Sequence, residues 1–497
     1  MDEEIAVAGG KPVLAEIKSI EKTEEKEAAG VKSRSFGLLA AFGILLLFHF
    51  GPTFPGLKQP TQSVLGVFLW FIVIMISDAL PNAIVGITSP LLLVLFAKMK
   101  VPQAFNAFNT DIFFLAAGAF IIAAVMMGTP LGKRITLTVA SIMKSNRVMR
   151  VMLGLSLAEL ATHPVIPVVN ETALFLPICK GMGSLMEGKE SRPEVKRINT
   201  AVLYFIAGIL PLFIGPLFLT SHFPNLILVG YLKDAQHLDI SWGRWFWINV
   251  PLWGLLPIAY LYVAWYFRLG GLVIPGAETG IANMRAELGK MTWLEKWALI
   301  CIFIGMFLWI TGWIQPGMAA LVVSFLLFVP WGGIEFKKIH QHILWDVLIL
   351  LGGAISLGTA LYKSGAVSWL SGIIVEPIRS LHLPVVVIFI ILAFGLHIAR
   401  AGIVSAVAAG AAFVPLVAGL ATALGYNVLP FSVVIINCLS YAFFLPFSIT
   451  AFLIAWSASG TSSWEAIKFG APLSIIANLY VILVQPVWLS LIGYPLR

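Results

Sequence analysis

Charged side chains are scarce in this chain of 497 residues. Asp, Glu, Lys and Arg together make up 11% of the sequence, while hydrophobic residues make up 59%. An average soluble domain carries about 25% charged residues. The composition therefore excludes an ordinary soluble enzyme or binding module. The net charge of +8 does not indicate nucleic acid as a partner, because Lys and Arg of membrane proteins gather in cytoplasmic loops.

Motifs for several kinds of chemistry are also missing. The three cysteines have no paired spacing typical of a metal site or a disulfide framework, so we expect them to serve as packing residues. The sequence contains no His-Glu-x-x-His motif and no nucleotide-binding P-loop. We therefore expect no enzyme activity, no catalytic residue, no metal site, no direct ATP hydrolysis and no cofactor other than a coupling ion.

The first 35 residues lack an apolar run. They contain eight acidic and six basic residues, which cannot bury a core. We expect residues 1–35 to form a disordered cytoplasmic tail. A cleavable signal peptide would need a basic region followed at once by an apolar stretch, and none occurs here.

Long apolar runs recur from residue 36 onward. About 20 apolar residues suffice for a helix to cross roughly 30 Å of hydrocarbon. We predict about eleven transmembrane helices, at residues 36–50, 62–82, 84–98, 112–128, 200–219, 245–267, 297–314, 317–332, 345–362, 430–456 and 470–493. The expected fold class is an all-α polytopic membrane protein.

Two further apolar stretches, residues 150–182 and 384–424, are too long for one crossing. Polar residues, Pro or Gly interrupt each of them near its middle. Each stretch therefore predicts a re-entrant hairpin that enters and leaves the membrane on one side.

Lys and Arg concentrate around the first hairpin and in residues 268–296. Because cytoplasmic loops hold the excess of Lys and Arg, these regions and the N-terminus are expected inside, with the second hairpin facing outside. We predict a multi-pass protein of the plasma (inner) membrane. Its two halves, residues 36–267 and 297–497, are joined by a cytoplasmic linker.

A sequence pattern occurs once in each half. Asp111-x3-Leu115-x2-Gly118-Ala119 is repeated as Asp346-x3-Leu350-x2-Gly353-Ala354. Each copy precedes a hairpin that closes with a proline, Pro177 or Pro415. Since the two halves have opposite predicted orientations, the pattern indicates inverted repeats, which are typical of secondary transporters with a substrate site at the membrane midplane.

The middle of the first hairpin combines two prolines with polar residues. Prolines break a helix and free backbone groups, of which amides suit an anion and carbonyls suit a cation. We take His163, Asn170 and Thr172 as candidate substrate ligands, and Asn170 and Glu171 as candidate coupling-ion ligands. The alternative is a kinked helix whose polar residues are satisfied locally.

The second hairpin carries Arg400 and Ser405 among small residues. A guanidinium matches the geometry of a carboxylate or sulfate, and an arginine inside an apolar hairpin indicates function. We take Arg400 as a substrate ligand and Ser405 as a ligand of both substrate and coupling ion. The alternative for Arg400 is a side chain that extends to the membrane interface.

A polar break follows each hairpin, at residues 215–225 and 445–450. Both breaks are expected to present hydroxyls and open backbone beside a hairpin tip. The candidate substrate ligands here are Ser221, His222, Asn225 and Thr450, and the candidate coupling-ion ligands are Gly215 and Ser448. Asp78, by contrast, is expected to be a structural carboxylate at a helix end.

These segments resemble the divalent anion:sodium symporter family, which carries dicarboxylates, citrate and sulfate. The likeness runs from about residue 70 to residue 470 and is strongest in Trp70–Pro81, Phe113–Arg134, Glu295–Gly312 and Trp345–Gly365. The resemblance implies two inverted repeats, each with a re-entrant hairpin and a broken helix. It also implies a homodimer with a scaffold and a moving transport domain.

The signatures of that family are only partly present. Its hairpin tips carry Ser-Asn-Thr, whereas this chain has Pro-Val-Val at 167–169 and Ser-Ala-Val at 405–407. Its broken helices carry Gly-Thr-Pro-Pro-Asn, of which the first break keeps only Pro224-Asn225. We therefore predict weak or absent sodium dependence. The coupling ion is left open between sodium and protons carried by Glu171 and His163.

The sequence thus predicts a secondary active transporter of a small anion, a dicarboxylate or related organic acid, that works by alternating access. The hairpin tips, residues 163–172 and 400–407, are expected to meet near the midplane. The expected partners are the anionic solute, the lipid bilayer and a second copy of the chain, with no nucleic acid. The alternative is a cation:proton antiporter, against which the fixed positive charge of Arg400 argues.

Overall fold

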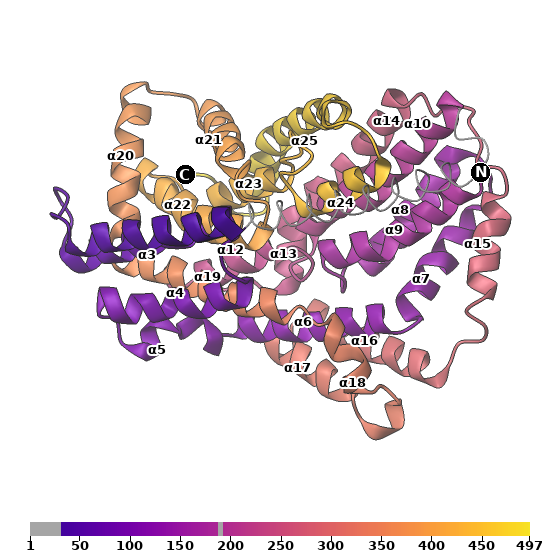
Figure 1. The fold of residues 1–497 in the computed structure, drawn as a ribbon, viewed down its shortest axis with the longest axis horizontal. Helices are drawn as coiled ribbons and strands as arrows, with labels where there is room; N and C mark the ends of the chain where they lie inside the picture. The colour runs from indigo at the N-terminus through magenta and orange to yellow at the C-terminus, as the bar shows by residue number, and fades with distance from the viewer. Residues whose placement is uncertain (1–30, 187–191) are drawn as a thin grey trace, which may run out of the picture.

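A computed structural model describes residues 31–186 and 192–497, and the fold is built from helices (Figure 1). Residues 1–30 of the predicted tail lie outside the described residues. The described part begins with the helix Val31–Phe50, so residues 31–35 are helical rather than part of a tail. Nine helices of the described part are long and apolar enough to cross a membrane, which agrees with the predicted all-α polytopic class.

The helices before residue 268 form the first half. After Val31–Phe50 they are α3 (Gln59–Ser77), α4 (Asn82–Ala97), α5 (Val101–Ala104), η1 (Asn106–Asn109), α6 (Asp111–Gly128), α7 (Leu131–Ala140), η2 (Ser141–Met143), α8 (Val148–Thr162), α9 (Val168–Ser184), α10 (Pro193–Val202), η3 (Leu203–Ile209), α11 (Leu210–Ile214), η4 (Gly215–Leu217), α12 (Phe223–Gln236), α13 (Trp242–Asn249), η5 (Val250–Gly254) and α14 (Leu255–Tyr266).

The remaining helices are α15 (Ala277–Ala286) in the linker and those of the second half. The latter are α16 (Trp293–Thr311), α17 (Pro316–Leu327), η6 (Pro330–Gly332), α18 (Phe336–Ile339), η7 (His340–His342), α19 (Trp345–Lys363), α20 (Ala366–Ser380), α21 (Val385–Arg400), α22 (Ala406–Leu424), α23 (Val428–Ser440), α24 (Thr450–Ser459) and α25 (Ser463–Leu491).

Both predicted hairpins and both predicted breaks are present. The arms of the first hairpin are α8 and α9, and those of the second are α21 and α22. Residues 218–222 separate η4 from α12, and residues 441–449 separate α23 from α24. Each half therefore contains a hairpin followed by a broken helix, as the inverted-repeat prediction requires.

Several helices, among them α7, α12 and α20, lie outside the predicted spans and hairpins, and α20 is the longest of these three. Residues 366–380 form α20, which buries Ala366, Val367, Ser371 and Val375 while Ile373 on its other side is 58% exposed. A Glu, an Arg and a Pro interrupt the apolar run in this segment, so hydropathy alone does not identify it as a span.

The two glycines of the repeated pattern lie where helices of the two halves cross. A Cβ on Gly118 of α6 would clash with Ala320 of α17, and a Cβ on Gly353 of α19 would clash with the backbone of Gly86 of α4. Small residues let transmembrane helices approach this closely. In Figure 1, α6 lies against α17 and α4 against α19, so the two halves interlock reciprocally.

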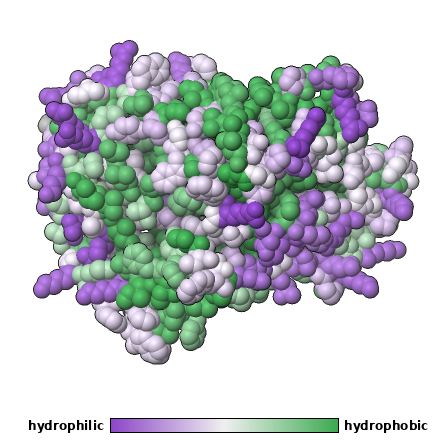
Figure 2. All heavy atoms as spheres, turned by 180° about the vertical axis from the view of Figure 1, so that it is seen from behind, coloured by the Kyte–Doolittle hydropathy of each residue, from purple (hydrophilic) through white to green (hydrophobic). Residues whose placement is uncertain are grey.

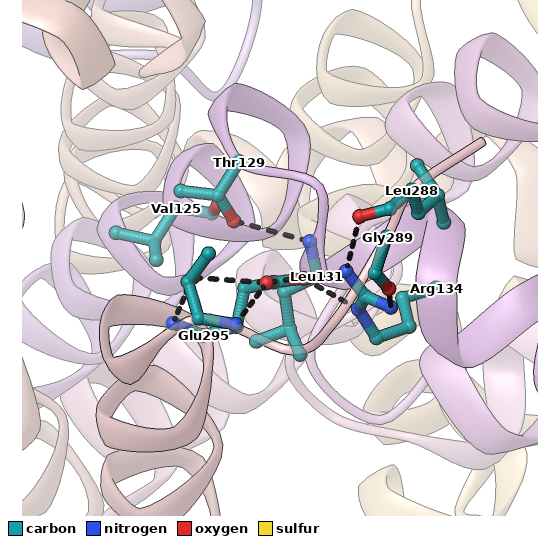
Figure 3. A network of polar contacts seen from close by, with 8 residues as sticks. Val125, Thr129, Leu131, Arg134, Leu288, Gly289 and Glu295 are labelled. Atoms are coloured by element: carbon teal, nitrogen blue, oxygen red, sulfur yellow. Dashed lines mark hydrogen bonds and ion pairs between the residues drawn. The ribbon is translucent and has the colours of Figure 1, made fainter. Parts of the chain in front are cut away.

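A polar network joins the linker to both halves (Figure 3). On α7, Nε of Arg134 donates to Oε1 of Glu295 at 2.6 Å, and its terminal nitrogens donate to the carbonyls of Leu288 and Gly289, each at 2.9 Å. Glu295 also closes a capping box with Thr292 at the start of α16. The arginine therefore fixes where the second half begins.

The outer surface is largely apolar. Figure 2 shows broad hydrophobic areas on one face of the molecule. Large side chains such as Trp265, Phe303 and Phe325 are 73%, 65% and 73% exposed. Soluble proteins do not expose apolar areas of this extent, whereas a lipid-facing surface requires them.

Candidate functional site

A cavity of about 470 Å³ lies between the two hairpins and the two helix breaks. This volume falls within the range of about 300–1,000 Å³ that is typical of small-molecule sites. The hairpins contribute Val168, Val169 and residues 404–407, and the breaks contribute His222, Phe223 and residues 449–451. The ends of α3, α4 and α19 complete the wall with residues that include Asp78, Asn82 and Val347.

The hairpins and the broken helices contribute the first turns of four helices to the wall of this cavity. Val168 begins α9, Phe223 begins α12, Ala406 begins α22 and Thr450 begins α24. The first four amides of a helix have no partner within it, and the N-terminus carries a partial positive charge of about +0.5. Four such termini around one space form a site suited to an anion.

Hydrogen bonds hold the first hairpin tip against the first break. The backbone N–H of Val168 donates to the carbonyl of Ser221 at 3.0 Å, and the hydroxyl of Thr220 donates to the carbonyl of Pro164 at 2.7 Å. The tip and the break therefore form one wall of the cavity.

Within the first break, Asn225 satisfies carbonyls that the broken helix leaves free. Its Nδ2 donates to the carbonyls of Phe218 at 3.0 Å and Gly215 at 3.3 Å. The hydroxyl of Ser221 donates to the carbonyl of Phe218 at 3.2 Å. Gly215, Ser221 and Asn225 were predicted to bind an ion or the substrate, but in this conformation their polar groups bind one another.

His222 is the predicted residue of the first half that lines the cavity. It precedes α12 and is 3% exposed. Its Nδ1 lies 3.4 Å from Oδ1 of Asn225 and 3.5 Å from the hydroxyl of Ser440. The ring thus links the break to α23 while it faces the cavity.

Arg400 is buried at the end of α21, where it is 2% exposed, and it does not line the cavity. Its Nε has no hydrogen-bond partner among the described residues, and no described carboxylate forms an ion pair with it. The guanidinium lies within electrostatic range of His222. An uncompensated buried cation is costly, and a nearby anion would offset that cost.

The other predicted residues of the second half divide into two groups. Ser405, which caps α22 by accepting from the N–H of Ala408 at 3.3 Å, lines the cavity, as does Thr450. Ser448 instead lines a separate, apolar space of about 380 Å³ beside His397. The structure therefore does not bring Ser448 together with the other candidate ion ligands.

The polar residues of the first hairpin lie around the cavity rather than in its wall. The hydroxyl of Thr172 donates to the carbonyl of Val168 at 3.2 Å, within its own helix, and Asn170 is 8% exposed. His163 and Glu171 are fully buried, and Nδ1 of His163 lies 3.6 Å from Oε1 of Glu171.

Two acidic residues belong to this region although they were not predicted as part of it. Asp78 ends α3, as expected of a structural carboxylate, but it also lines the cavity and pairs with Arg34 at 3.1 Å. Glu159 is fully buried on α8, one turn before His163. A lone acid within an apolar hairpin arm is a sequence signal that could have identified Glu159, although its proximity to Glu171 could not be read from the sequence.

Comparisons with known proteins agree with this architecture. Residues 32–494 match the protein family described as the sodium:sulfate symporter transmembrane region. A sodium-dependent dicarboxylate transporter of Staphylococcus saprophyticus is 27% identical over 475 residues, covering 89% of this chain and 88% of that protein. A transporter of the same description from Staphylococcus aureus is 26% identical over 472 residues, with the same coverage.

A solved structure shows a similar fold. The crystal structure of the YdaH transporter of Alcanivorax borkumensis matches with a TM-score of 0.52 at 13% sequence identity. The match covers 88% of this chain and 100% of that one. At this identity the likeness concerns the fold alone.

Proposed function

This chain belongs to the sodium:sulfate symporter family, and on that premise we propose that it is a secondary active transporter of a small dicarboxylate or related organic acid. The family consists of membrane transporters rather than enzymes. One observation carries the proposal: four helix N-termini converge on a single cavity between the two hairpins. Hairpins that meet at such a site favour alternating access.

The charges around the cavity favour an anion over a cation. The helix termini contribute partial positive charge, and the buried guanidinium of Arg400 lies within electrostatic range of His222. The acidic residue on the wall, Asp78, is paired with Arg34. These charges favour an anion carrier over the alternative of a cation:proton antiporter.

The shape of the cavity favours a dicarboxylate over sulfate. Between the helix termini the wall is apolar, with Val168, Val169, Val404 and Val407. An aliphatic chain fits such a wall while its two carboxylates reach different helix N-termini. Two similar proteins are described as dicarboxylate transporters, which is consistent with this choice.

The remaining features of the proposal extend the sequence predictions. The transporter is coupled to sodium or protons and works as a homodimer in the plasma (inner) membrane. Its N-terminus, the linker at 268–296 and the base of the first hairpin face the cytoplasm, and the second hairpin opens outward.

Counterflow in proteoliposomes tests the function. Vesicles loaded with unlabelled succinate should take up labelled succinate faster than protein-free vesicles, and excess external dicarboxylate should compete. Labelled sulfate provides the comparison for substrate class, and labelled rubidium under a pH gradient tests the antiporter alternative. Rubidium exchange without counterflow of either anion would refute the proposal.

A further inference from the structure

Two carboxylates lie buried together inside the first hairpin, behind the cavity wall. Glu159 on α8 and Glu171 on α9 are both 0% exposed. Glu159 precedes His163 by one helical turn, and Oε1 of Glu171 lies 3.6 Å from Nδ1 of the same histidine. Among the described residues, none of their four carboxylate oxygens accepts a hydrogen bond of standard geometry, although the hydroxyl of Thr162 lies near Glu171. Because nearly all buried polar groups in proteins are satisfied, this pair requires an explanation.

His163 lies beside the two acids. Its Nδ1 is 3.6 Å from Oε1 of Glu171, and its backbone N–H donates to the carbonyl of Glu159 at 2.9 Å. Neither ring nitrogen makes a hydrogen bond of standard geometry within the described part of the chain, although the backbone carbonyl of Pro211 lies near the ring. Glu159, His163 and Glu171 together are called the acid–histidine cluster below.

No cation on the surrounding elements compensates the cluster. The titratable groups on the two arms and on the elements packed against them are Arg150 on α8, Cys179 and Lys180 on α9, Asp111 on α6, Lys133 and Arg134 on α7, Glu194, Lys196 and Arg197 on α10 and Tyr204 on η3. Arg150 and Lys180 are exposed, and His222 and Arg400 lie on the side of the first break. Arg134 forms an ion pair with Glu295. Helix α10, which carries Lys196 and Arg197, approaches α9 near Gly183, about three turns beyond Glu171. In residues 31–186 and 192–497, no Lys or Arg forms an ion pair with either acid.

Two ionised carboxylates cannot share a desolvated site without a cation, because burial and mutual repulsion both disfavour the ionised forms. At least one of the two acids therefore holds a proton. The adjacent imidazole can accept and return that proton. We propose that the acid–histidine cluster binds the proton that crosses the membrane together with the anion, an inference that rests on the proposed transport function.

The cluster is positioned to couple proton binding to anion binding. Glu171 lies one turn after Val168, the cavity-lining residue that begins α9. An ionised Glu171 partly cancels the positive charge at the N-terminus of this helix. Protonation removes that negative charge, so the N-terminus becomes more attractive to an anion. Protonation should therefore strengthen anion binding, and by linkage a bound anion should strengthen proton binding equally.

The geometry around Gly215 supports this coupling. A Cβ built on Gly215 would lie 3.5 Å from Nε2 of His163 and 3.5 Å from Cβ of His222. Because His222 lines the cavity, the histidine of the cluster and the histidine of the anion site flank the same glycine. A change of charge in the cluster therefore changes the electrostatic potential at the cavity, from which the cluster is separated by one residue.

The test uses the full chain in sodium-free proteoliposomes with the membrane potential clamped at zero. For one proton per anion, an inward gradient of one pH unit should support about a tenfold accumulation of labelled succinate. Glu171→Gln and Glu159→Gln should lose this accumulation but keep succinate counterflow, because exchange moves no net protons. Glu335→Gln, which alters an exposed carboxylate paired with Lys338, should behave like the wild type.

A second measurement needs no variant. Adding succinate to weakly buffered wild-type protein in detergent should alkalinise the medium as the cluster takes up a proton. Accumulation driven by sodium and indifferent to pH would overturn the inference, as would full pH-driven accumulation in both Glu→Gln variants. Absence of succinate counterflow in the wild type would instead refute the transport function itself. Failure of the proton-binding inference and failure of the proposed function are therefore distinguishable.

Discussion

At the scale of single residues, the chain separates the polar groups that face the cavity from those that act from behind it. His222, Ser405 and Thr450 lie in the wall, whereas Arg400 and the acid–histidine cluster lie behind it. Charges behind the wall act through low-dielectric surroundings, where they are screened little. They can therefore tune the site without touching the solute.

Arg400 provides the first residue-scale prediction. Arg400→Gln removes an uncompensated buried charge near His222 and should raise the half-saturation concentration for succinate roughly tenfold or more, since each tenfold corresponds to about 1.4 kcal/mol. Arg400→Lys should recover part of the loss, because the charge is kept but its reach differs.

Counterflow at several succinate concentrations measures this effect. The matched control is Arg150→Gln, at an exposed arginine on an arm of the other hairpin. An unchanged half-saturation concentration in Arg400→Gln would mean that the helix N-termini and His222 hold the anion alone.

Gly215 gives a second prediction. The added methyl of Gly215→Ala would lie 2.7 Å from Cγ2 of Val168, so the hairpin tip or the break must shift. A displacement of this kind typically costs about 1–3 kcal/mol, and we expect succinate counterflow to fall several-fold or more. Gly372→Ala, where a Cβ meets nothing within 4 Å, should leave counterflow unchanged. Equal succinate counterflow in the two variants would contradict the close contact between Gly215 and Val168.

At the scale of elements, the hairpins and broken helices were predictable from sequence because their signals are local. An apolar run of 33 or more residues with a polar centre, such as residues 150–182, cannot be a single span. The glycine pattern at 118 and 353 also has a local signature, although the partner helices on which these glycines pack could not be read from it.

Other element-scale features depend on contacts that the residue types do not reveal, some of them local and some distant in sequence. The amides of Asn225 and hydroxyls such as Thr172 bond to backbone within their own segments, which the residue types alone do not reveal. Asp78 reaches the cavity only because α3 packs beside the second hairpin. Glu159 was not singled out, because its importance arises from its proximity to Glu171 on the other arm.

The reciprocal crossing of the two halves gives an element-scale prediction. Gly353→Ala places a methyl against the backbone of Gly86, which cannot move as a side chain does. Thermal unfolding in detergent should shift to a lower temperature, corresponding to about 1–3 kcal/mol. Gly395→Ala on α21, where a Cβ has no neighbour within 4 Å, should not lower it. A Gly353→Ala variant as stable as the wild type would show that the halves are not held together at this crossing.

At the scale of the whole molecule, the two halves enclose one site from opposite sides. Each contributes a hairpin tip and a broken helix, so motion of either tip relative to the rest changes the access to the cavity. The linker is fixed to both halves through Arg134 and Glu295. The account's central claim is that a dicarboxylate binds where the four helix N-termini converge.

Protection of single introduced cysteines tests that claim most directly. The native cysteines Cys179, Cys301 and Cys438 are buried and should give little background. Val169→Cys and Ala406→Cys place a thiol on the cavity wall in each hairpin, and Ser380→Cys serves as an exposed control on α20. We predict that succinate slows the reaction of both cavity thiols with a maleimide and leaves the control unchanged. Unaltered labelling of both cavity thiols at succinate concentrations that saturate counterflow would contradict the account.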